Sequence, residues 1–434
     1  MQKEVATSDQ DTPVEKPRAA AQVKFDTLKL DVTVQKGIDA LGFEFCSPIQ
    51  AQILPHTLGG NDAIGKAQTG TGKTAAFLVT IFNDLLSHPI EGERFLGEPR
   101  AVIIAPAREL VMQIAEDAQE LGKFTGLQTV TMIGGADYQK QLSKVNRAPV
   151  DLVVATPGRL IDFMERRDLA LDRVEILVLD EADRMLDMGF IHDIKKIMKL
   201  LPERRQNLMF TATFSNSFRA LAKEVAEKAI EISVTTDNET GANIEHYVHP
   251  VDKSRKAELL IELIETENWS QALVFTRTKH GADRLQKQLD KVGIKSQAIH
   301  GNKTQNNRMK ALEAFKNNKI RILVATDVAA RGIDIKKMSQ VINFDVPTVA
   351  KDYVHRIGRT GRAGDKGKAI TLVSIDEYRI LLDIEKLLNQ KLERVEIAGF
   401  EPVDVVPSKD NPPKSKKKFN NQGGYRKRTR NRKG

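Results

Sequence analysis

The sequence predicts an α/β fold with two similar domains in tandem, each a parallel sheet covered by helices on both faces. Short apolar runs alternate with stretches of helical spacing, and this alternation is typical of such sheets. The alternation stops over Ser233–Gly241 and starts again at Ile244, which indicates a linker. A chain of 434 residues has room for about three domains by length alone, and its 41% hydrophobic content is enough for ordinary cores.

The predicted strands are apolar runs between helical stretches, and a first one ends near Ile64. In the first half they are Val102–Ala105, Val130–Ile133, Leu152–Ala155, Ile176–Leu179 and Leu208–Phe210. In the second half they are Ala272–Phe275, Gln297–Ile299, Ile322–Ala325, Val341–Phe344 and Ala369–Val373. The stretches EILVLDEAD and RILVATDVAARGID are loosely alike, since each is an apolar strand that ends in Asp. This likeness favours two related folds.

The chain is predicted to divide into two domains and three less regular segments. Residues 1–24 are polar and contain prolines, so we expect a disordered leader. The domains are expected over residues 25–232 and 244–400, with a linker over residues 233–243. Residues 401–434 are expected to form a disordered basic tail.

The positive charge of the chain is concentrated at its C-terminus. Ser408–Gly434 holds eleven Lys and Arg and one acid, a balance of +10, whereas the whole chain has a net charge of +9. The remaining residues therefore sum to −1. A basic tail is suited to a polyanion such as nucleic acid, and the alternative is a tail that only improves solubility.

Cysteine usage and hydropathy indicate a soluble cytoplasmic protein. The single cysteine, Cys46, excludes an intramolecular disulfide and fits a reducing compartment. No apolar stretch approaches the roughly twenty residues that a membrane helix needs, and the N-terminus lacks a signal-peptide core.

The stretch Ala67–Thr74, AQTGTGKT, has the pattern of a phosphate-binding loop. In such a loop backbone N–H groups converge on phosphate oxygens, Lys73 places its charge between the β- and γ-phosphates, and the Thr74 hydroxyl reaches Mg²⁺. Ala67 stands where the pattern usually has glycine, and we expect a slight shift of geometry. The alternative is a Gly/Thr-rich turn beside an exposed lysine.

Two acids follow the predicted strand Ile176–Leu179 directly. Asp180 can hold Mg²⁺, usually through water, and Glu181 can orient and deprotonate an attacking water. The alternative is an acidic helix N-terminus that is favourable with the helix dipole.

Two other features carry weaker signals on their own. Gln50 offers an amide that suits an adenine edge, and Phe25 an aromatic face, although on the residues alone a helix-capping turn and a core phenylalanine are the favoured explanation. The segment HRIGRTGR holds Arg356, Arg359 and Arg362, which suit a γ-phosphate reached from another domain, or simply a basic turn on a solvated face. Trp269 and the eight histidines show no metal-ligand spacing.

Taken in chain order, these motifs resemble those of the DEAD-box RNA helicases. The shared segments are GFEFCSPIQ, AQTGTGKT, PAREL, GG, TPGR, DEAD, TAT, QNNR, ATDVAARGID and HRIGRTGR. The resemblance covers roughly Phe25 to Phe400, and a compact core with a basic tail is similar to the bacterial RhlB-like or RhlE-like branch. It implies two tandem RecA-like domains.

The resemblance also implies roles for individual residues. ATP binding would fall to Phe25, Gln50, Ala67, Gln68, Thr69, Gly70, Thr71, Gly72, Lys73, Thr74 and Asp334, with Asp334 at the ribose. Lys73, Asp180, Glu181, Arg359 and Arg362 would be catalytic, the last two as arginine fingers, and Thr74 and Asp180 would serve Mg²⁺. RNA would meet Arg108, Gly135, Thr156, Arg159, Arg277, Gln305, Arg308 and Thr326, while Thr211 and Thr213 would couple the two sites.

Two motifs depart from the family pattern. PAREL has Ala107 where threonine is usual, which removes a hydrogen bond worth roughly 0.5–1.5 kcal/mol and modestly weakens RNA binding. TAT replaces SAT and keeps the hydroxyl, so we expect little change.

The predicted function is RNA-stimulated ATP hydrolysis that unwinds or remodels short RNA duplexes with little sequence preference. The expected partners are RNA and an RNA-decay nuclease assembly, with ATP and Mg²⁺ as cofactors, a monomeric core and no membrane. The alternatives are an ATP-gated RNA clamp without productive unwinding, a DNA-directed motor and a small-molecule kinase.

Overall fold

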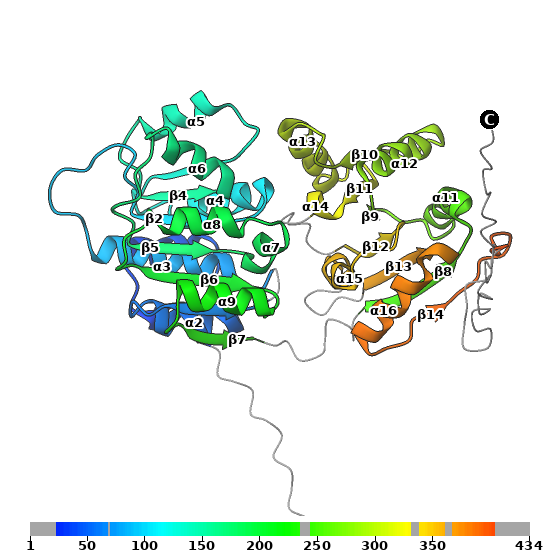
Figure 1. The fold of residues 1–434 in the computed structure, drawn as a ribbon, viewed down its shortest axis with the longest axis horizontal. Coiled ribbons are helices and arrows are strands. Elements are labelled where there is room, and N and C mark those ends of the chain that lie inside the picture. Colours follow the sequence, from blue (N-terminus) through cyan, green and yellow to red (C-terminus); the bar gives the residue numbers. More distant parts are fainter. Residues whose placement is uncertain (1–22, 68–69, 235–243, 331–337, 361–366, 404–434) are drawn as a thin grey trace, which may run out of the picture. The chain divides into compact units, whose positions relative to one another are not determined.

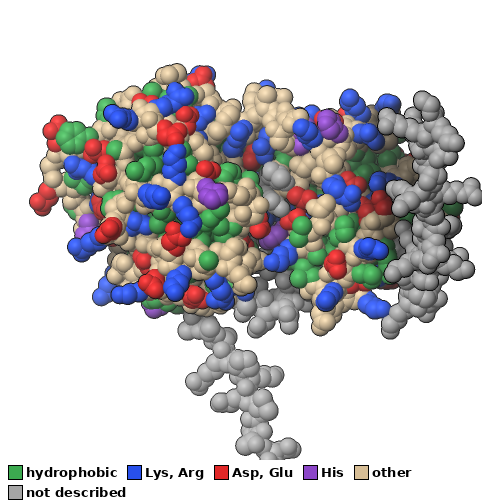
Figure 2. Space-filling model, in the orientation of Figure 1, with side chains coloured by type: hydrophobic (Ala, Val, Ile, Leu, Met, Phe, Trp, Pro, Cys, Tyr) green, Lys and Arg blue, Asp and Glu red, His purple; other side chains and the backbone are tan. Residues whose placement is uncertain are grey.

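A computed structural model of the protein describes residues 23–67, 70–234, 244–330, 338–360 and 367–403, and these form two compact units. Nearly all of the predicted leader and basic tail and most of the predicted linker lie outside the described residues. On the face drawn in Figure 2, basic and acidic side chains are interspersed over the N-terminal unit. No helix within the described ranges has both the length and the apolar character that crossing a membrane requires.

The N-terminal unit is built on a parallel sheet whose seven strands have the order β3-β4-β2-β5-β6-β1-β7. The strands are β1 (Ala63–Lys66), β2 (Ala101–Ile104), β3 (Thr129–Met132), β4 (Leu152–Ala155), β5 (Ile176–Leu179), β6 (Gln206–Thr211) and β7 (Ile230–Ser233). The helices are η1 (Phe25–Leu28), α1 (Val32–Ala40), α2 (Pro48–Thr57), α3 (Lys73–Ser87), α4 (Arg108–Leu121), α5 (Tyr138–Val145), α6 (Pro157–Glu165), α7 (Ala182–Asp187), α8 (Ile191–Met198) and α9 (Asn216–Val225).

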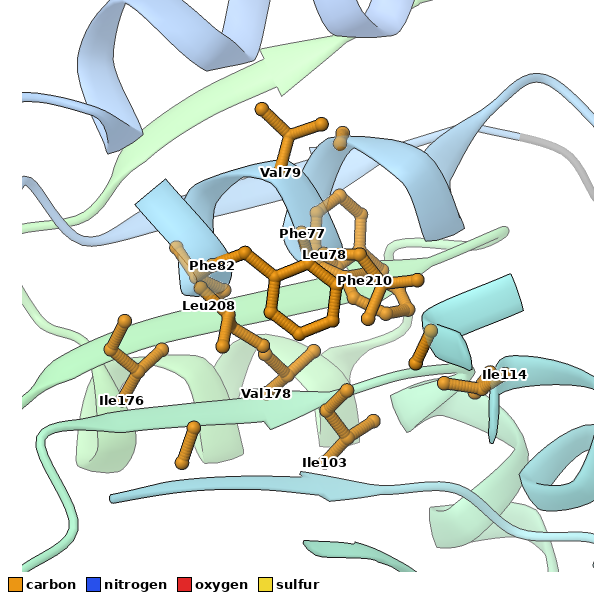
Figure 3. Packing of buried hydrophobic residues seen from close by; sticks show 14 of the residues in the cluster. Phe77, Leu78, Val79, Phe82, Ile103, Ile114, Ile176, Val178, Leu208 and Phe210 are labelled. Carbon is orange, nitrogen blue, oxygen red and sulfur yellow. The ribbon is translucent and has the colours of Figure 1, made fainter. Parts of the chain in front are cut away.

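Both faces of this sheet are buried, because its strands alternate their side chains between two hydrophobic clusters. In β5, Val178 belongs to one cluster and Leu177 and Leu179 belong to the other. Helix α3 packs on the first face, where the ring centroids of Phe77 and Phe210 are 5.4 Å apart (Figures 1 and 3). Burial of each such side chain contributes about 1.5–3 kcal/mol, so this packing fixes the start of α3 against the sheet.

The C-terminal unit is a second parallel sheet of seven strands, in the order β10-β11-β9-β12-β13-β8-β14. Its strands are β8 (Ile244–Pro250), β9 (Ala272–Thr276), β10 (Ser296–Ile299), β11 (Ile322–Thr326), β12 (Gln340–Asn343), β13 (Gly367–Val373) and β14 (Glu393–Arg394). Its helices are η2 (Lys253–Arg255), α11 (Lys256–Thr266), α12 (Lys279–Lys291), α13 (Gln305–Lys316), α14 (Asp327–Ala330), α15 (Ala350–Ile357), η3 (Ile375–Glu377) and α16 (Tyr378–Leu388).

The two sheets have the same topology, since in each the strands stand in the order third, fourth, second, fifth, sixth, first, seventh. The prediction of two related folds in tandem is confirmed. The two stretches whose likeness suggested it are not structural counterparts, however. The strand before DEAD is β5, whose counterpart is β12, whereas the strand before ATDVAARGID is β11, the counterpart of β4.

Every strand predicted in full is present, with bounds that differ by at most two residues. The edge strands β7 and β14 were not predicted, and for β8 only the restart of the alternation at Ile244 was predicted. Ile230–Ser233 is exposed at alternate positions and Glu393–Arg394 has only two residues, so neither gives the continuous apolar run of a buried strand.

Candidate active site

The loop between β1 and α3 closes on itself around a buried lysine. The Ala67 N–H donates to the Thr211 carbonyl at 3.0 Å, and Lys73, the first residue of α3, donates from Nζ to the Ala67 carbonyl at 2.9 Å. Gly72 has φ of 94°, in the left-handed region that favours glycine. The predicted loop residues Gln68 and Thr69 lie outside the described residues, whereas Gly70, Thr71 and Thr74 lie within them.

Gln50 joins the N-terminus of α2 to this loop. Its Oε1 accepts the Ser47 N–H at 2.7 Å, and its Nε2 donates to the Gly72 carbonyl at 2.9 Å. A Cβ atom on Gly72 would lie 2.5 Å from Nε2 of Gln50, so a side chain at position 72 would displace the amide. Gln50 therefore caps a helix, as one interpretation predicted, and also holds the loop.

Phe25 is a core residue in this structure. Its ring is 1% exposed and stacks on Phe43 with centroids 6.4 Å apart and an interplanar angle of 24°. This agrees with the interpretation of a core phenylalanine, and stacking on adenine stays a prediction.

The two acids after β5 are buried beside the loop lysine. Asp180 is 3% exposed, and its Oδ1 accepts the Glu181 N–H at 2.9 Å. Glu181 has φ of 49°, a backbone conformation that costs a non-glycine residue energy and is concentrated at functional sites. Its Oε2 accepts from Nη1 of Arg184 at 3.0 Å.

Burial raises the pKa of Asp180 to about 6, against an opposing effect of the nearby Lys73 charge and with a further rise from Glu181. Burial makes the charged form of this carboxylate unfavourable, and a bound cation would offset that penalty. Among the described residues no group of three or more His, Cys, Asp or Glu side chains could hold a metal. Mg²⁺ usually needs only one or two carboxylates because phosphates and waters supply the other ligands, so Asp180 and the Thr74 hydroxyl fit it.

Asp183 connects the acidic motif to β6 and was not among the predicted site residues. Its Oδ2 accepts from the Thr213 N–H at 2.9 Å and from the Thr213 hydroxyl at 2.8 Å. The Thr211 hydroxyl donates to the Thr213 carbonyl at 2.8 Å. Of the predicted coupling pair, Thr213 is thus bonded directly to the segment that carries Glu181, and Thr211 is bonded to Thr213. The sequence signal that could have pointed to Asp183 was its place as the third acid of the short DEAD motif.

Four of the residues predicted to meet RNA follow neighbouring strands of the N-terminal sheet. Arg108 begins α4 after β2, Gly135 follows β3, and Thr156 precedes α6 after β4. A Cβ atom on Gly135 would lie 2.4 Å from Nη1 of Arg108. Arg159 donates from Nη2 to the Ala136 carbonyl at 3.1 Å. The four residues therefore lie at the carboxyl edge of the sheet, where ligands bind in such folds.

The remaining predicted RNA contacts lie in the C-terminal half. Arg277 directly follows β9, and Thr326 ends β11 in register with Thr276. Gln305 begins α13 and Arg308 is in its first turn. Arg277 and Thr326 therefore come from neighbouring strands at one edge of their sheet.

The arginines of HRIGRTGR have different surroundings. Arg356 is fully buried and binds both carboxylate oxygens of Asp327, with distances of 2.6 and 2.7 Å. It also donates from Nη1 to Asn343 at 3.0 Å, so it does not lie on a solvated face. Arg359 follows α15, and its carbonyl accepts the Met338 N–H. Arg362 and Asp334 lie outside the described residues.

A glycine-rich loop ahead of a helix, a buried lysine and two acids after a central strand define a nucleotide-hydrolysing protein with a phosphate-binding loop. Residues 47–221 match the family model of the DEAD/DEAH box helicases, and residues 255–364 match that of the helicase conserved C-terminal domain. The chain belongs to the DEAD-box family of ATP-dependent RNA helicases.

Within that family the chain is similar to RhlB. It is 46% identical to the ATP-dependent RNA helicase RhlB of Pseudomonas syringae pv. tomato, over 86% of this chain and 94% of that protein. S. cerevisiae Dbp5 bound to RNA and ADP BeF3 has a TM-score of 0.75 at 32% identity, over 86% of this chain and 95% of that one. The helicase Mss116 bound to ssRNA and UDP-BeF has a TM-score of 0.77 at 29% identity, over 87% and 81%. Both structures support the tandem RecA-like fold.

Proposed function

We propose that this chain couples ATP hydrolysis to the local unwinding or remodelling of short RNA duplexes. The observation that carries the proposal is the buried group formed by Lys73, Asp180 and Glu181 at the ends of β1 and β5. It combines a phosphate-binding cation with a carboxylate suited to Mg²⁺ and a second carboxylate suited to activating water.

In this proposal the loop from Ala67 to Thr74 cradles the phosphates. Its backbone N–H groups and the N-terminus of α3 meet phosphate oxygens, while Lys73 supplies a positive charge. Asp180 and the Thr74 hydroxyl would hold Mg²⁺, which neutralises charge on the phosphates when bound. Gln50 recognises the adenine edge, Phe25 stacks on its face, and Asp334 meets the ribose.

Glu181 acts as the general base in this scheme. Its unusual backbone conformation and its bond from Arg184 restrict where the carboxylate points, which is what the orientation of an attacking water requires. Arg359 and Arg362 would stabilise charge on the γ-phosphate as arginine fingers, so that hydrolysis depends on both domains.

RNA binding is assigned to the arginines and small residues at the carboxyl edges of the two sheets. We propose that Arg108, Arg159, Arg277 and Arg308 meet backbone phosphates, and that Gly135, Thr156, Gln305 and Thr326 complete the path. Contacts of this kind give little sequence preference. Thr213, bonded to Asp183, would report the state of the nucleotide site through Thr211.

The wider setting is proposed from the similarity to RhlB. We propose a monomeric core over residues 25–400 with the boundaries given above, a cytoplasmic location, and association with a nuclease assembly for RNA decay. The basic tail would add affinity for RNA, independent of sequence.

An ATPase assay with matched single strands of RNA and DNA, combined with unwinding of a short labelled RNA duplex, tests the function. We expect stimulation by RNA well above that by DNA, and strand separation that needs ATP. Equal stimulation by DNA would favour a DNA-directed motor. ATP-dependent RNA retention without turnover would favour a clamp, and hydrolysis indifferent to both polymers would overturn the proposal.

A further inference from the structure

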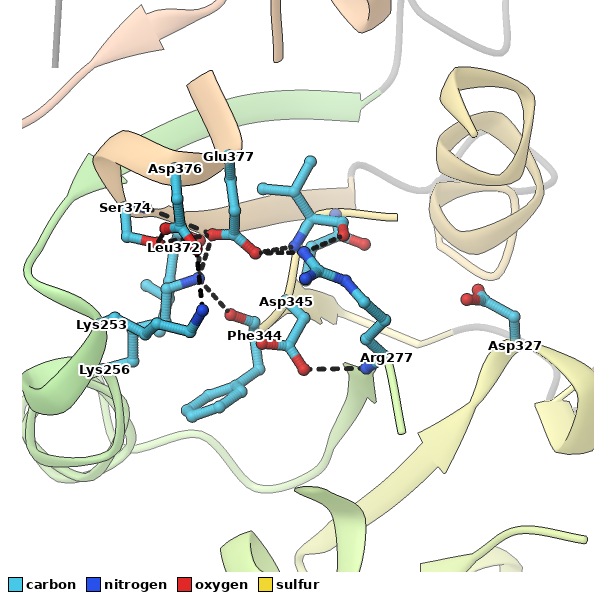
Figure 4. A network of polar contacts seen from close by, with 12 residues as sticks. Lys253, Lys256, Arg277, Asp327, Phe344, Asp345, Leu372, Ser374, Asp376 and Glu377 are labelled. Carbon is cyan, nitrogen blue, oxygen red and sulfur yellow. Dashed lines mark hydrogen bonds and ion pairs between the residues drawn. The ribbon is translucent and has the colours of Figure 1, made fainter. Parts of the chain in front are cut away.

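A buried group of charges lies beneath Arg277 in the C-terminal unit, and nothing in the scheme above uses it. The group is centred on Lys256, the first residue of α11, and Glu377, the last residue of η3 (Figure 4). Lys256 is 1% exposed and Glu377 is 3% exposed. Charges buried to this degree are costly unless every polar atom has a partner.

Lys256 uses its full hydrogen-bonding capacity inside the protein. Its Nζ donates to the Phe344 carbonyl at 2.9 Å, to the Leu372 carbonyl at 2.8 Å, and to Oε2 of Glu377. An ammonium group has three N–H donors, so none remains for a ligand. Lys256 therefore ties α11 to the ends of β12 and β13 and holds one oxygen of Glu377 in place.

The two carboxylate oxygens of Glu377 have different partners, since Oε2 faces Lys256 and Oε1 faces Arg277. Oε2 accepts from Lys256 and from the Ser374 N–H at 3.3 Å. Oε1 accepts from Nη2 of Arg277 at 2.7 Å and from the Val346 N–H at 3.2 Å. The carboxylate is thus fixed from four directions, and one of its lone pairs is directed at Arg277.

Among the described residues, the guanidinium of Arg277 is bound through Nη2 and not through its other nitrogens. Its backbone N–H donates to Asp345 at 2.8 Å, and its Nη2 donates to Glu377 and to the Val346 carbonyl. Its side chain is 33% exposed. Its Nε is buried and has no hydrogen-bond partner within the described part of the chain, and Nη1 has none there either. The guanidinium is a rigid planar fork, so fixing Nη2 also fixes the direction of the remaining N–H groups.

We propose that Lys256 and Glu377 are positioning residues for Arg277 and hold its guanidinium in the orientation in which it meets an RNA phosphate. The proposal rests on the assignment of Arg277 to the RNA path. A free arginine side chain loses rotamer entropy when it is held in one orientation. Ordering it before RNA arrives removes part of that cost from binding.

A purely structural role for the pair is the competing explanation, in which it only secures α11 and η3 on the sheet. The two explanations differ in one respect. A structural pair affects RNA binding whether or not Arg277 is present, whereas a positioning pair acts only through Arg277. A double-mutant cycle separates these cases.

The test compares Glu377→Gln, Arg277→Gln and the double variant in the full chain. The measured quantity is the single-stranded RNA concentration that gives half-maximal ATPase stimulation. Donors approach Glu377 on both sides, so a glutamine amide can accept on only one of them, and the charged Lys256 takes that oxygen. We expect a rise of roughly tenfold for Arg277→Gln and roughly threefold to tenfold for Glu377→Gln. The double variant should equal Arg277→Gln within about twofold.

Glu385→Gln is the matched control. Glu385 is also buried in the C-terminal unit, on α16, where it pairs with Arg394 and accepts the Leu392 N–H at 2.8 Å. It makes no contact with Arg277 among the described residues. We expect both glutamate variants to lose thermal stability and keep RNA-independent hydrolysis, but only Glu377→Gln to change the RNA concentration needed.

Arg277→Lys tests the proposal without altering the buried pair, which covers the case in which Glu377→Gln does not fold. Lysine keeps the charge but not the planar fork. We expect the RNA requirement to rise nearly as much as for Arg277→Gln, whereas a value equal to wild type would show that orientation is unimportant.

The outcomes also separate this proposal from the proposed function. Hydrolysis that RNA does not stimulate in the wild type overturns both. Normal stimulation with no effect of Arg277→Gln overturns only the positioning role. Additive effects of the two single substitutions in the double variant also overturn it, because Glu377 would then act independently of Arg277.

Discussion

The two units have the same strand order, and in each a lysine begins the first α-helix after the first strand. The hydrogen bonds of that lysine differ between the units. In the N-terminal unit this residue is Lys73 at the start of α3, and in the C-terminal unit it is Lys256 at the start of α11. Lys73 donates to one carbonyl, that of Ala67, among the described residues. Lys256 donates to three acceptors of the protein. Lys73 therefore has donor capacity left for a ligand, whereas all three N–H donors of Lys256 bind groups of the protein.

The connecting segments explain this difference. The loop before Lys73 contains Gly70 and Gly72, both with positive φ, so its backbone can curve around an anion. The segment from Val251 to Arg255 has no glycine and contains the short helix η2. In addition, Glu377 places a carboxylate against Lys256. Topology alone therefore does not create a phosphate site, which also needs a loop that leaves the lysine free.

The acids after the fifth strand differ in the same way. β5 is followed by Asp180 and Glu181, which lie beside Lys73. Its counterpart β12 is followed by Phe344 and Asp345, and Asp345 accepts the backbone N–H of Arg277 at 2.8 Å. The first pair is suited to chemistry on a phosphate, whereas Asp345 secures an arginine proposed to meet RNA.

The largest effect is expected for Glu181→Gln, which removes the general base proposed for the N-terminal unit. Loss of a general base lowers the rate of hydrolysis by about 10²–10⁴-fold, while ATP and RNA should still bind together. Single-turnover hydrolysis with bound RNA measures this rate, with the exposed Glu203→Gln as control. Hydrolysis at the wild-type rate would show that another group activates the water.

The two lysines provide the second prediction. Lys73→Ala should lower hydrolysis by about 10²–10³-fold, as expected for loss of a charge that stabilises the transition state. Lys256→Met should instead lower the free energy of unfolding by about 3–5 kcal/mol, because it leaves Glu377 buried without its main partner. Urea unfolding and ATPase assays on both variants check this contrast. The same pattern of losses in both variants would contradict the division of roles.

The third prediction concerns pH and Asp180. Burial raises the pKa of this carboxyl from 3.8 to about 6, so the folded state binds the proton more tightly than the unfolded state does. Stability is therefore lost as pH rises from about 4 to about 6, by about 3 kcal/mol at most. Asp180→Asn should remove this cost, making the nucleotide-free N-terminal unit more stable than wild type at pH 7.5 and less different at pH 4. Thermal unfolding at both pH values tests this, and an equal difference at the two would contradict it.

A smaller effect is expected for Thr213→Val, which removes the hydroxyl bond to Asp183. A hydrogen bond to a charged group contributes about 1.5–3 kcal/mol. If Thr213 couples the sites, unwinding should fall more than RNA-stimulated hydrolysis does, because Glu181 is untouched. Parallel unwinding and ATPase assays give the ratio, and equal losses in both activities would argue for a purely structural role.

The smallest effect is expected for Lys253→Ala, at the exposed edge of the C-terminal network. Lys253 and the Ser374 hydroxyl donate to Asp376 and lower its pKa to about 2. Both charged side chains remain well exposed, so loss of the pair should cost about 0.2–1 kcal/mol. Urea unfolding of Lys253→Ala and Lys256→Met measures the loss in free energy of unfolding for each. An equally large loss in both variants would contradict this prediction.

The sequence by itself determined the tandem α/β architecture, most of the strands, and the loop that ends in Lys73 and Thr74. These features are local: apolar periodicity, glycines and short motifs are readable without knowing what packs against them. The placement of Asp180 and Glu181 after a buried strand was equally local, because β5 is a continuous apolar run.

Only the tertiary structure decided which charges stay available and which are consumed within the fold. Arg356 and Arg277 look alike in sequence, yet all three guanidinium nitrogens of Arg356 are bound, Nε and Nη2 by Asp327 and Nη1 by Asn343, while the guanidinium of Arg277 is held by one nitrogen. Asp183 and Glu377 gained partners from segments 30 and 100 residues away. How many hydrogen-bond donors or acceptors of a side chain stay unbound depends on such distant neighbours, which the local sequence does not identify.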